Sequence, residues 1–187
     1  MKRLPVFILG VSAITAVLAT FSAHIQPAVA AEPTTATKKA DQPSEAALER
    51  SRKQVQMLDN IYKQAVVLIT DKYVHDEDDF AAGSAAVLWF ENISKSGSHK
   101  VRLSDASGDP YDDKNVAQDH FEREGIKRLK AGASIYEQVQ QIDGKPQLPS
   151  LTPVPVVMKK CIMCHDHYRD AKEGEPIGAI SYTLPIE

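Results

Sequence analysis

The first part of the chain carries apolar side chains at the three- and four-residue spacing of an amphipathic helix. Ser44 followed by Glu45 and a long stretch without glycine or proline predicts a helix that runs to about Val74. Residues 65–69 are apolar on every side, so we expect this half of the helix to be enclosed by the rest of the domain. A second helix is predicted over 81–95. The apolar positions that define the first helix are Val55, Leu58, Tyr62, Ala65 and Ile69.

After Gly97 the pattern changes to the two-residue alternation of half-buried strands. A helical pattern over 121–129 interrupts it, and Asp143-Gly144 between two alternating runs marks a hairpin turn. The prolines within 151–157 favour an edge position for that strand. Helices followed by mainly antiparallel strands predict an α+β domain. The segments expected to form strands are 99–104, 134–142, 151–157 and 178–186.

The N-terminus has the pattern of a targeting segment. Two basic residues precede an apolar run over 4–21, and the tripeptide at 28–30 has the small side chains that signal peptidase requires. We therefore expect an exported protein, periplasmic or otherwise extracytoplasmic. An uncleaved membrane anchor is the alternative, because the run approaches the about 17–25 residues that span a bilayer. The expected organisation is a signal peptide over 1–30, a flexible mature N-terminus over 31–44 and a folded domain over 45–187.

Composition limits the classes of function. The chain is 43% hydrophobic and 25% charged, which is typical of a globular protein. A net charge of −3 without a dense basic block argues against nucleic-acid binding, and an acidic surface would suit transient docking to a basic redox partner. The only two cysteines lie three positions apart, which excludes a disulfide framework and a four-cysteine metal site within this chain.

Residues 161–165 read Cys-Ile-Met-Cys-His, the C-x-x-C-H sequence at which c-type haem is attached. Two thiols three residues apart can each add to a haem vinyl group, and the next residue then places an imidazole below the iron. We therefore expect one covalent haem c, bound through Cys161 and Cys164, with His165 as the proximal iron ligand. Haem is attached in this way outside the cytoplasm, which agrees with the signal peptide.

Three other chemistries use two cysteines at this spacing. A thioredoxin-like redox pair would need an alternating βαβ pattern, which the chain lacks. Half of a zinc site could be completed by His165 and His167, although their crowding beside Cys164 makes a tetrahedral arrangement awkward. A simple disulfide is the third alternative.

The residues around this motif resemble the PAS-like single-haem c-type domains of exported bacterial proteins, long catalogued as a domain of unknown function. The resemblance rests on 153–160, on Tyr168 and on 173–181, and extends more weakly over 58–187. It implies N-terminal helices followed by a PAS-like antiparallel sheet, with the haem attached near the C-terminus and held against that sheet. The positions that match the family's attachment cysteines and proximal ligand are Cys161, Cys164 and His165.

The chain departs from that family at the sixth iron ligand. Some relatives supply a cysteine from the N-terminal helical region, and no cysteine precedes Cys161 here. The remaining options are histidine, methionine, another group, water or an open position. His75, at the end of the long helix, is the distal ligand to test first, and a solvated histidine among acidic neighbours is its competing interpretation. The other candidates are Met57, His99 and His120. Basic side chains that could pair with the haem propionates are Arg102, Lys159, Lys160 and Arg169.

These features predict an exported monohaem c-type cytochrome that exchanges electrons with a separate redox protein. The alternative is a periplasmic haem-based redox or gas sensor that signals through a separate partner. An enzyme would need a positioned acid–base group on an open distal face, and nothing in the spacing selects one. We therefore expect a carrier or a sensor rather than a catalyst, no nucleic-acid partner, and membrane association only if the signal segment stays uncleaved.

Overall fold

Local capping sets the ends of the helices. The structure, a computed structural model, describes residues 42–76, 79–110, 112–163 and 168–187. The Ser44 hydroxyl accepts a hydrogen bond from the backbone N–H of Ala47 at 3.2 Å and begins the first helix where the sequence predicts it. Gly97 ends the second helix with a left-handed φ of 87°. The helices are α1 (Glu45–Tyr73), α2 (Ala82–Ser96), α3 (His120–Lys130) and the short 3-10 helices η1 (Asp113–Asn115) and η2 (Lys159–Ile162).

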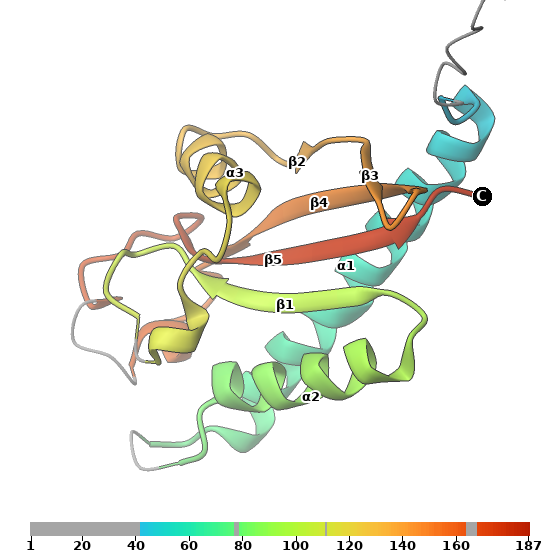
Figure 1. The fold of residues 1–187 in the computed structure, drawn as a ribbon. Coiled ribbons are helices and arrows are strands. Elements are labelled where there is room, and N and C mark those ends of the chain that lie inside the picture. Colours follow the sequence, from blue (N-terminus) through green and yellow to red (C-terminus); the bar gives the residue numbers. More distant parts are fainter. Residues whose placement is uncertain (1–41, 77–78, 111, 164–167) are drawn as a thin grey trace, which may run out of the picture. The chain divides into compact units, whose positions relative to one another are not determined.

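Five strands form one antiparallel sheet in which β5 lies between β1 and β4 (Figure 1). The two short strands β2 and β3 both pair with β4 on its other side. At the predicted hairpin turn, Asp143 and Gly144 both have a positive φ, of 53° and 73°, as a two-residue hairpin loop requires. The strands are β1 (Lys100–Asp105), β2 (Tyr136–Glu137), β3 (Gln140–Ile142), β4 (Lys145–Pro155) and β5 (Pro176–Pro185).

Helices cover both faces of this sheet (Figure 1). On one face, α1 and α2 pack against the sheet and form the larger core, with Tyr62, Phe90 and Tyr182 at its centre. On the other face, Phe121 of α3 packs with Leu151 of β4 in a smaller core. Successive side chains along each strand point to opposite faces of the sheet, as the pleat requires. The described residues belong to one compact unit, and the predicted α+β fold with N-terminal helices before an antiparallel sheet is confirmed.

The enclosure that we predicted for residues 65–69 is wrong. None of these side chains is fully buried, and Leu68 is 57% exposed. Val66 and Val67 instead line a hollow between α1, α2 and the sheet. Their apolar side chains therefore form part of a cavity wall, and Val66 also packs against the larger core.

The edge position expected for residues 151–157 is confirmed over 152–155, which pair with β5 alone among the described strands. The preceding part of β4 is interior, because it pairs with β5 on one side and with β3 and β2 on the other. The prolines are tolerated for a local reason. The carbonyl of Pro149 accepts a hydrogen bond from Gln138, so the Pro149 nitrogen points to the gap between β2 and β3. Pro153 and Pro155 point the same way by alternation, beyond Leu151, where no described strand pairs with that side of β4.

The predicted signal peptide and most of the predicted flexible segment lie outside the described residues, so this organisation stays a prediction. Across the described parts of the chain, the helices are all too short or too polar to cross a bilayer.

Candidate functional site

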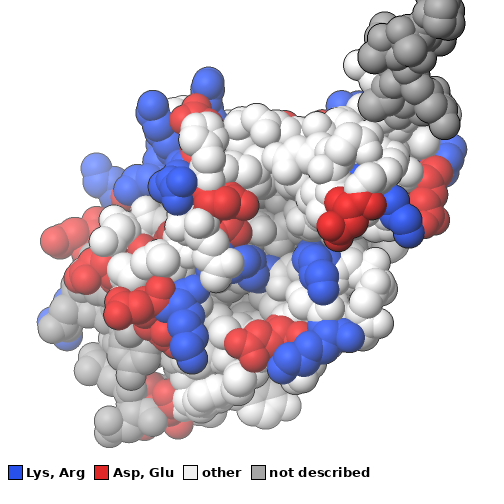
Figure 2. Space-filling model, viewed as in Figure 1, with Lys and Arg blue, Asp and Glu red and all other residues white. Residues whose placement is uncertain are grey.

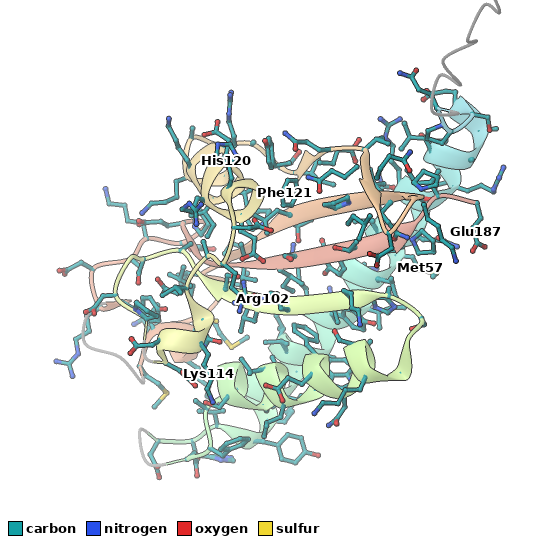
Figure 3. The ribbon with its side chains drawn as sticks, viewed as in Figure 1. Met57, Arg102, Lys114, His120, Phe121 and Glu187 are labelled. Carbon is teal, nitrogen blue, oxygen red and sulfur yellow. The ribbon has the colours of Figure 1, made fainter. Side chains whose placement is uncertain are left out.

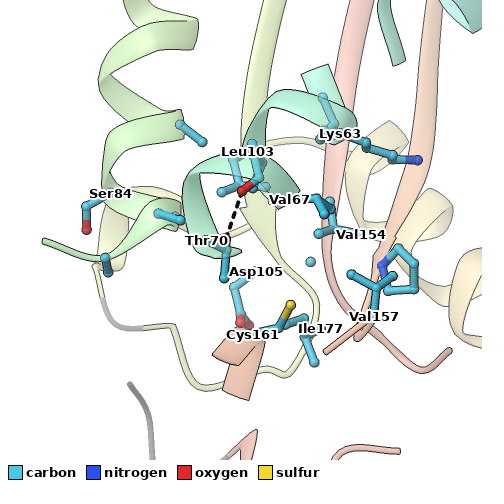
Figure 4. A pocket seen from close by; sticks show the side chains of 18 of the residues that line it. Lys63, Val67, Thr70, Ser84, Leu103, Asp105, Val154, Val157, Cys161 and Ile177 are labelled. Atoms are coloured by element: carbon cyan, nitrogen blue, oxygen red, sulfur yellow. Dashed lines mark hydrogen bonds between the residues drawn. The ribbon is translucent and has the colours of Figure 1, made fainter. Parts of the chain in front are cut away.

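A cavity of about 480 Å³ opens between the second half of α1, the start of α2 and the sheet (Figure 4). Its wall is mostly apolar. Val66 and Val67 come from α1, whereas the residues that α2 contributes at its first turn are small. The sheet supplies branched side chains from three neighbouring strands. The cavity-lining apolar residues of α2 and the sheet include Ala82, Ala86, Phe90, Leu103, Val154, Pro155, Ile177 and Ile180.

Cys161 lies in η2 and contributes to this wall, which Asp105 and Ile177 also line (Figure 4). The Lys160 ammonium donates to the backbone carbonyl of Asp71 at 2.7 Å and so ties η2 to the end of α1. The amide of Cys161 donates to the carbonyl of Met158 at 3.0 Å. Cys164 and His165 lie outside the described residues, so their predicted roles stay predictions.

Downstream of the motif, Tyr168 ties the chain to the end of β1. Its hydroxyl donates to Asp105 at 2.6 Å, and both residues line the cavity. Burial acts to raise the pKa of Asp105, but hydrogen bonds from Tyr168, Ser107 and Gly108 outweigh it, and that pKa lies below its ordinary value. Burial and the neighbouring carboxylate raise the pKa of Tyr168 well above 10. The segment that carries the motif is thus anchored before and after it.

The end of the cavity nearest the middle of α1 is polar. One carboxylate oxygen of Asp59 accepts hydrogen bonds from Thr152 at 2.5 Å and from Tyr182 at 3.0 Å. The other oxygen accepts from the ammonium of Lys63 at 2.8 Å. Burial, followed by the charge of Asp59, raises the pKa of Tyr182, which therefore stays a neutral donor. Asp59 and Lys63 both line the cavity.

None of the described candidates for the sixth iron ligand lines the cavity. His75 is 70% exposed at the end of α1, where its backbone N–H donates to Asp79 at 2.6 Å. Met57 is 55% exposed and borders a second hollow together with the C-terminal Glu187 (Figure 3). The predicted ligand role of His75 stays a prediction.

The two remaining histidine candidates are directed elsewhere. The Nε2 atom of His99 lies 2.9 Å from the hydroxyl of Tyr62, and burial lowers the pKa of this imidazole. His120 begins α3, on the sheet face opposite the cavity (Figure 3).

Arg102, one of the expected propionate partners, has a structural role. Its guanidinium pairs with the buried carboxylate of Glu122 and donates to the carbonyls of Lys114 and Val116 at 2.9 and 3.1 Å (Figure 3). It joins β1 to η1 and α3 and does not line the cavity. Of the other expected partners, Lys160 does line it.

Sequence reasoning missed the Asp59–Lys63 pair. Its only signal was an acidic and a basic residue four positions apart on a helix, a spacing that usually marks a solvated surface pair. The tertiary structure gives the pair its place, because Thr152 and Tyr182 of the sheet close over Asp59.

Comparison with known proteins supports this architecture. A family model described as Tll0287-like matches residues 13–185. A crystal structure of the cyanobacterial heme-protein Tll0287 superposes with a TM-score of 0.51 at 11% sequence identity, covering 76% of this chain and 96% of that chain, which indicates a shared fold. No curated protein sequence matches the chain.

Proposed function

The chain belongs to the Tll0287-like family, and from that premise we propose that it is an exported monohaem c-type cytochrome that acts in electron transfer. This agrees with the family resemblance found in the sequence. The observation that carries the proposal is the position of Cys161, the first cysteine of the attachment motif, in the wall of the cavity.

The cavity suits a haem in size and chemistry. Its volume of about 480 Å³ lies within the range of cofactor sites, about 300–1,000 Å³, and its mostly apolar wall suits a flat hydrophobic macrocycle. Cys161 and Cys164 would hold the group through thioethers, and His165 would bind its iron. When bound, the haem supplies a centre that accepts and donates single electrons.

A haem-based redox or gas sensor is the second candidate. The observation that favours it is the composition of the wall, because no imidazole or thioether occurs among its described residues. An iron without a strong second protein ligand is open to exogenous ligands. His75 as sixth ligand is the competing arrangement, and it requires the exposed imidazole to move to the cavity.

The partner that we propose is a separate redox protein, or a signalling protein if the sensor role holds. Figure 2 shows Lys and Arg side chains gathered over α3, with acidic and basic side chains mixed elsewhere on that face. Since α3 packs on the sheet face away from the cavity, this basic group does not border the cavity. The exposed basic residues of α3 are Arg123, Lys127, Arg128 and Lys130.

Covalent attachment is tested by replacing both thiols. In protein exported by cells that attach haem, the wild type should keep its haem through acid–acetone extraction and stain on a denaturing gel. The Cys161→Ala/Cys164→Ala double variant should lose this signal completely, because no thioether can form. Intact mass of the wild type should equal residues 31–187 plus one haem. Extraction of the haem from wild-type protein would contradict the proposal.

Carbon monoxide separates the two roles. A spectrum of the reduced protein that does not change with the gas indicates a closed six-coordinate iron and favours electron transfer. A shifted Soret band indicates an open or displaceable site and favours sensing. Comparing His75→Ala with wild type then tests the distal ligand, since loss of low-spin bands in that variant alone would identify His75.

A further inference from the structure

The cavity has two chemically different ends that are joined by one face of α1. At one end, η2 carries Cys161 and contacts α1 through the bond from Lys160 to the carbonyl of Asp71. Lys63 lies eight residues earlier on the same helix, about 12 Å along its axis. The cavity is therefore bordered by a thiol near one end and by an ammonium group nearer the other.

Lys63 is held in place by an anchored carboxylate. Asp59 accepts from Lys63 at 2.8 Å, and Thr152 and Tyr182 fix its second oxygen from the sheet. The ammonium has three N–H donors, and Asp59 takes one of them. Because the Lys63 side chain is only 25% exposed, its charge is less screened than that of a surface lysine. The site is thus organised to receive a second acceptor from the cavity.

Neighbouring side chains add further N–H donors beside Lys63. Asn60 and Gln64 also line the cavity, and with Lys63 they occupy adjacent positions on one face of α1. Amide N–H groups and an ammonium group together suit a carboxylate, which accepts several hydrogen bonds at once.

We propose that Lys63 binds a propionate carboxylate of the haem, with Asp59 as the positioning residue that holds the ammonium at the cavity wall. This rests on the proposed function, since it needs a haem attached at Cys161. The chemistry of haem supports the assignment, because the vinyl groups that react with cysteines and the two propionates lie on opposite edges of the macrocycle. Lys160, beside the attachment cysteine, is at the wrong end to be the main propionate partner.

The pair should control the reduction potential. Reduction adds one negative charge to the haem, so a nearby cation stabilises the reduced form and a nearby anion opposes it. Lys63→Met leaves Asp59 and the propionate uncompensated and should lower the midpoint potential. Asp59→Asn leaves the ammonium uncompensated and should raise it. The two variants are therefore expected to shift the potential in opposite directions.

A pH profile distinguishes direct binding of the propionate from a general charge effect. An ammonium bound to a carboxylate keeps the pKa of that carboxylate low. In Lys63→Met the propionate pKa should rise, so the potential should become more dependent on pH between about 5 and 7 than in the wild type. Among the described residues, the other titratable groups that face this space are Asp59, Asp105, Lys160, Cys161 and Tyr168, with Tyr182 touching Asp59.

The experiment is a potentiometric titration, from pH 5 to pH 8, of the purified haem-loaded proteins. Lys160→Met is the matched control, because it removes a cation from the same wall and should add no pH dependence. Lys63→Arg should restore the wild-type profile. The proposal is overturned if Lys63→Met and the wild type have the same potential and pH profile. It is equally overturned if Lys63→Met alone loses low-spin absorption bands, since Lys63 would then be an iron ligand.

A different result would show that the proposed function itself is wrong. Wild-type protein without covalent haem would contradict that function and the propionate assignment together, before any variants are compared. All variants should stain for haem to the same extent, because attachment depends on the two thiols and not on Lys63.

Discussion

The layer between α1, α2 and the sheet has two ends that differ in how they are filled. At the end nearer the middle of α1, large side chains close the space. Tyr62 stacks on Tyr182 with ring centroids 6.3 Å apart and contacts Phe90 at 5.3 Å. Leu148 and Val55 are fully buried beside them. This end is complete as protein alone.

Towards η2 each element changes to smaller side chains. On α1, Thr70 stands on the cavity wall where Tyr62 fills the core two turns earlier. On α2, Ala86 precedes Phe90 by one turn, and on β5 Gly178 takes the place that Tyr182 has further along. The change in size at equivalent positions leaves the cavity.

The same helices and strands run through both ends. The volume of their side chains decides which end is a filled core and which end holds the cavity. The open cavity of about 480 Å³ with its mostly apolar wall therefore has room for a ligand, whereas the filled end does not. The filled end should therefore carry most of the stability of the haem-free chain.

The largest expected effect on stability comes from emptying the filled end. Leu148→Ala removes a side chain that is 1% exposed and should lower the free energy of unfolding by about 2–5 kcal/mol, because the space cannot collapse fully. Leu68→Ala is the matched control on α1, where the side chain is 57% exposed, and should change stability by no more than about 0.5 kcal/mol. Urea unfolding measures both. Similar losses of unfolding free energy in the two variants would contradict the view that the filled end carries most of the stability.

Two helical glycines provide a second, intermediate test. In Gly125→Ala the added Cβ would lie 2.6 Å from Leu151 and 2.9 Å from Tyr136, so the α3 core should lose about 1–3 kcal/mol through overpacking. Gly83→Ala, on the cavity wall, meets nothing within 4 Å and should gain at most about 1 kcal/mol from the lower backbone entropy of the unfolded chain. Thermal unfolding of the two variants should give shifts of opposite sign. A stabilising effect of Gly125→Ala would show that α3 is less closely packed than described.

The smallest expected effect is a pH dependence at the boundary of the filled end. Burial lowers the pKa of His99 below its ordinary value of 6.5, so the folded protein binds its proton less well than the unfolded chain does. Stability from this group is present above pH 6.5 and is lost as the pH falls towards the lowered pKa. His99→Gln, which still offers a partner to Tyr62, should have a smaller decrease in urea midpoint between pH 7 and pH 5. An unchanged pH profile would exclude His99 as a source of acid sensitivity.

Local signals in the sequence determined the elements and predicted the chemistry of the C-x-x-C-H motif. Ser44, Gly97 and Asp143-Gly144 act through hydrogen bonds and backbone angles within a few residues, so the ends of the helices and the hairpin were predictable. The α+β order and the family resemblance followed from patterns of the same kind, and both are confirmed. The C-x-x-C-H motif is likewise a local arrangement of reactive groups.

Only the tertiary structure decided where a cavity lies beside the motif and which charged side chains border that cavity. Neighbours in sequence do not show that the first part of β4 is interior, that Arg102 pairs with Glu122, or that Lys63 lies beside the cavity. Each depends on contacts between distant segments, such as Asp59 with Tyr182, 123 positions apart. Periodicity tells which side of a helix is apolar, but the volume left between two apolar surfaces depends on how the opposing side chains meet, and that is set by the fold as a whole.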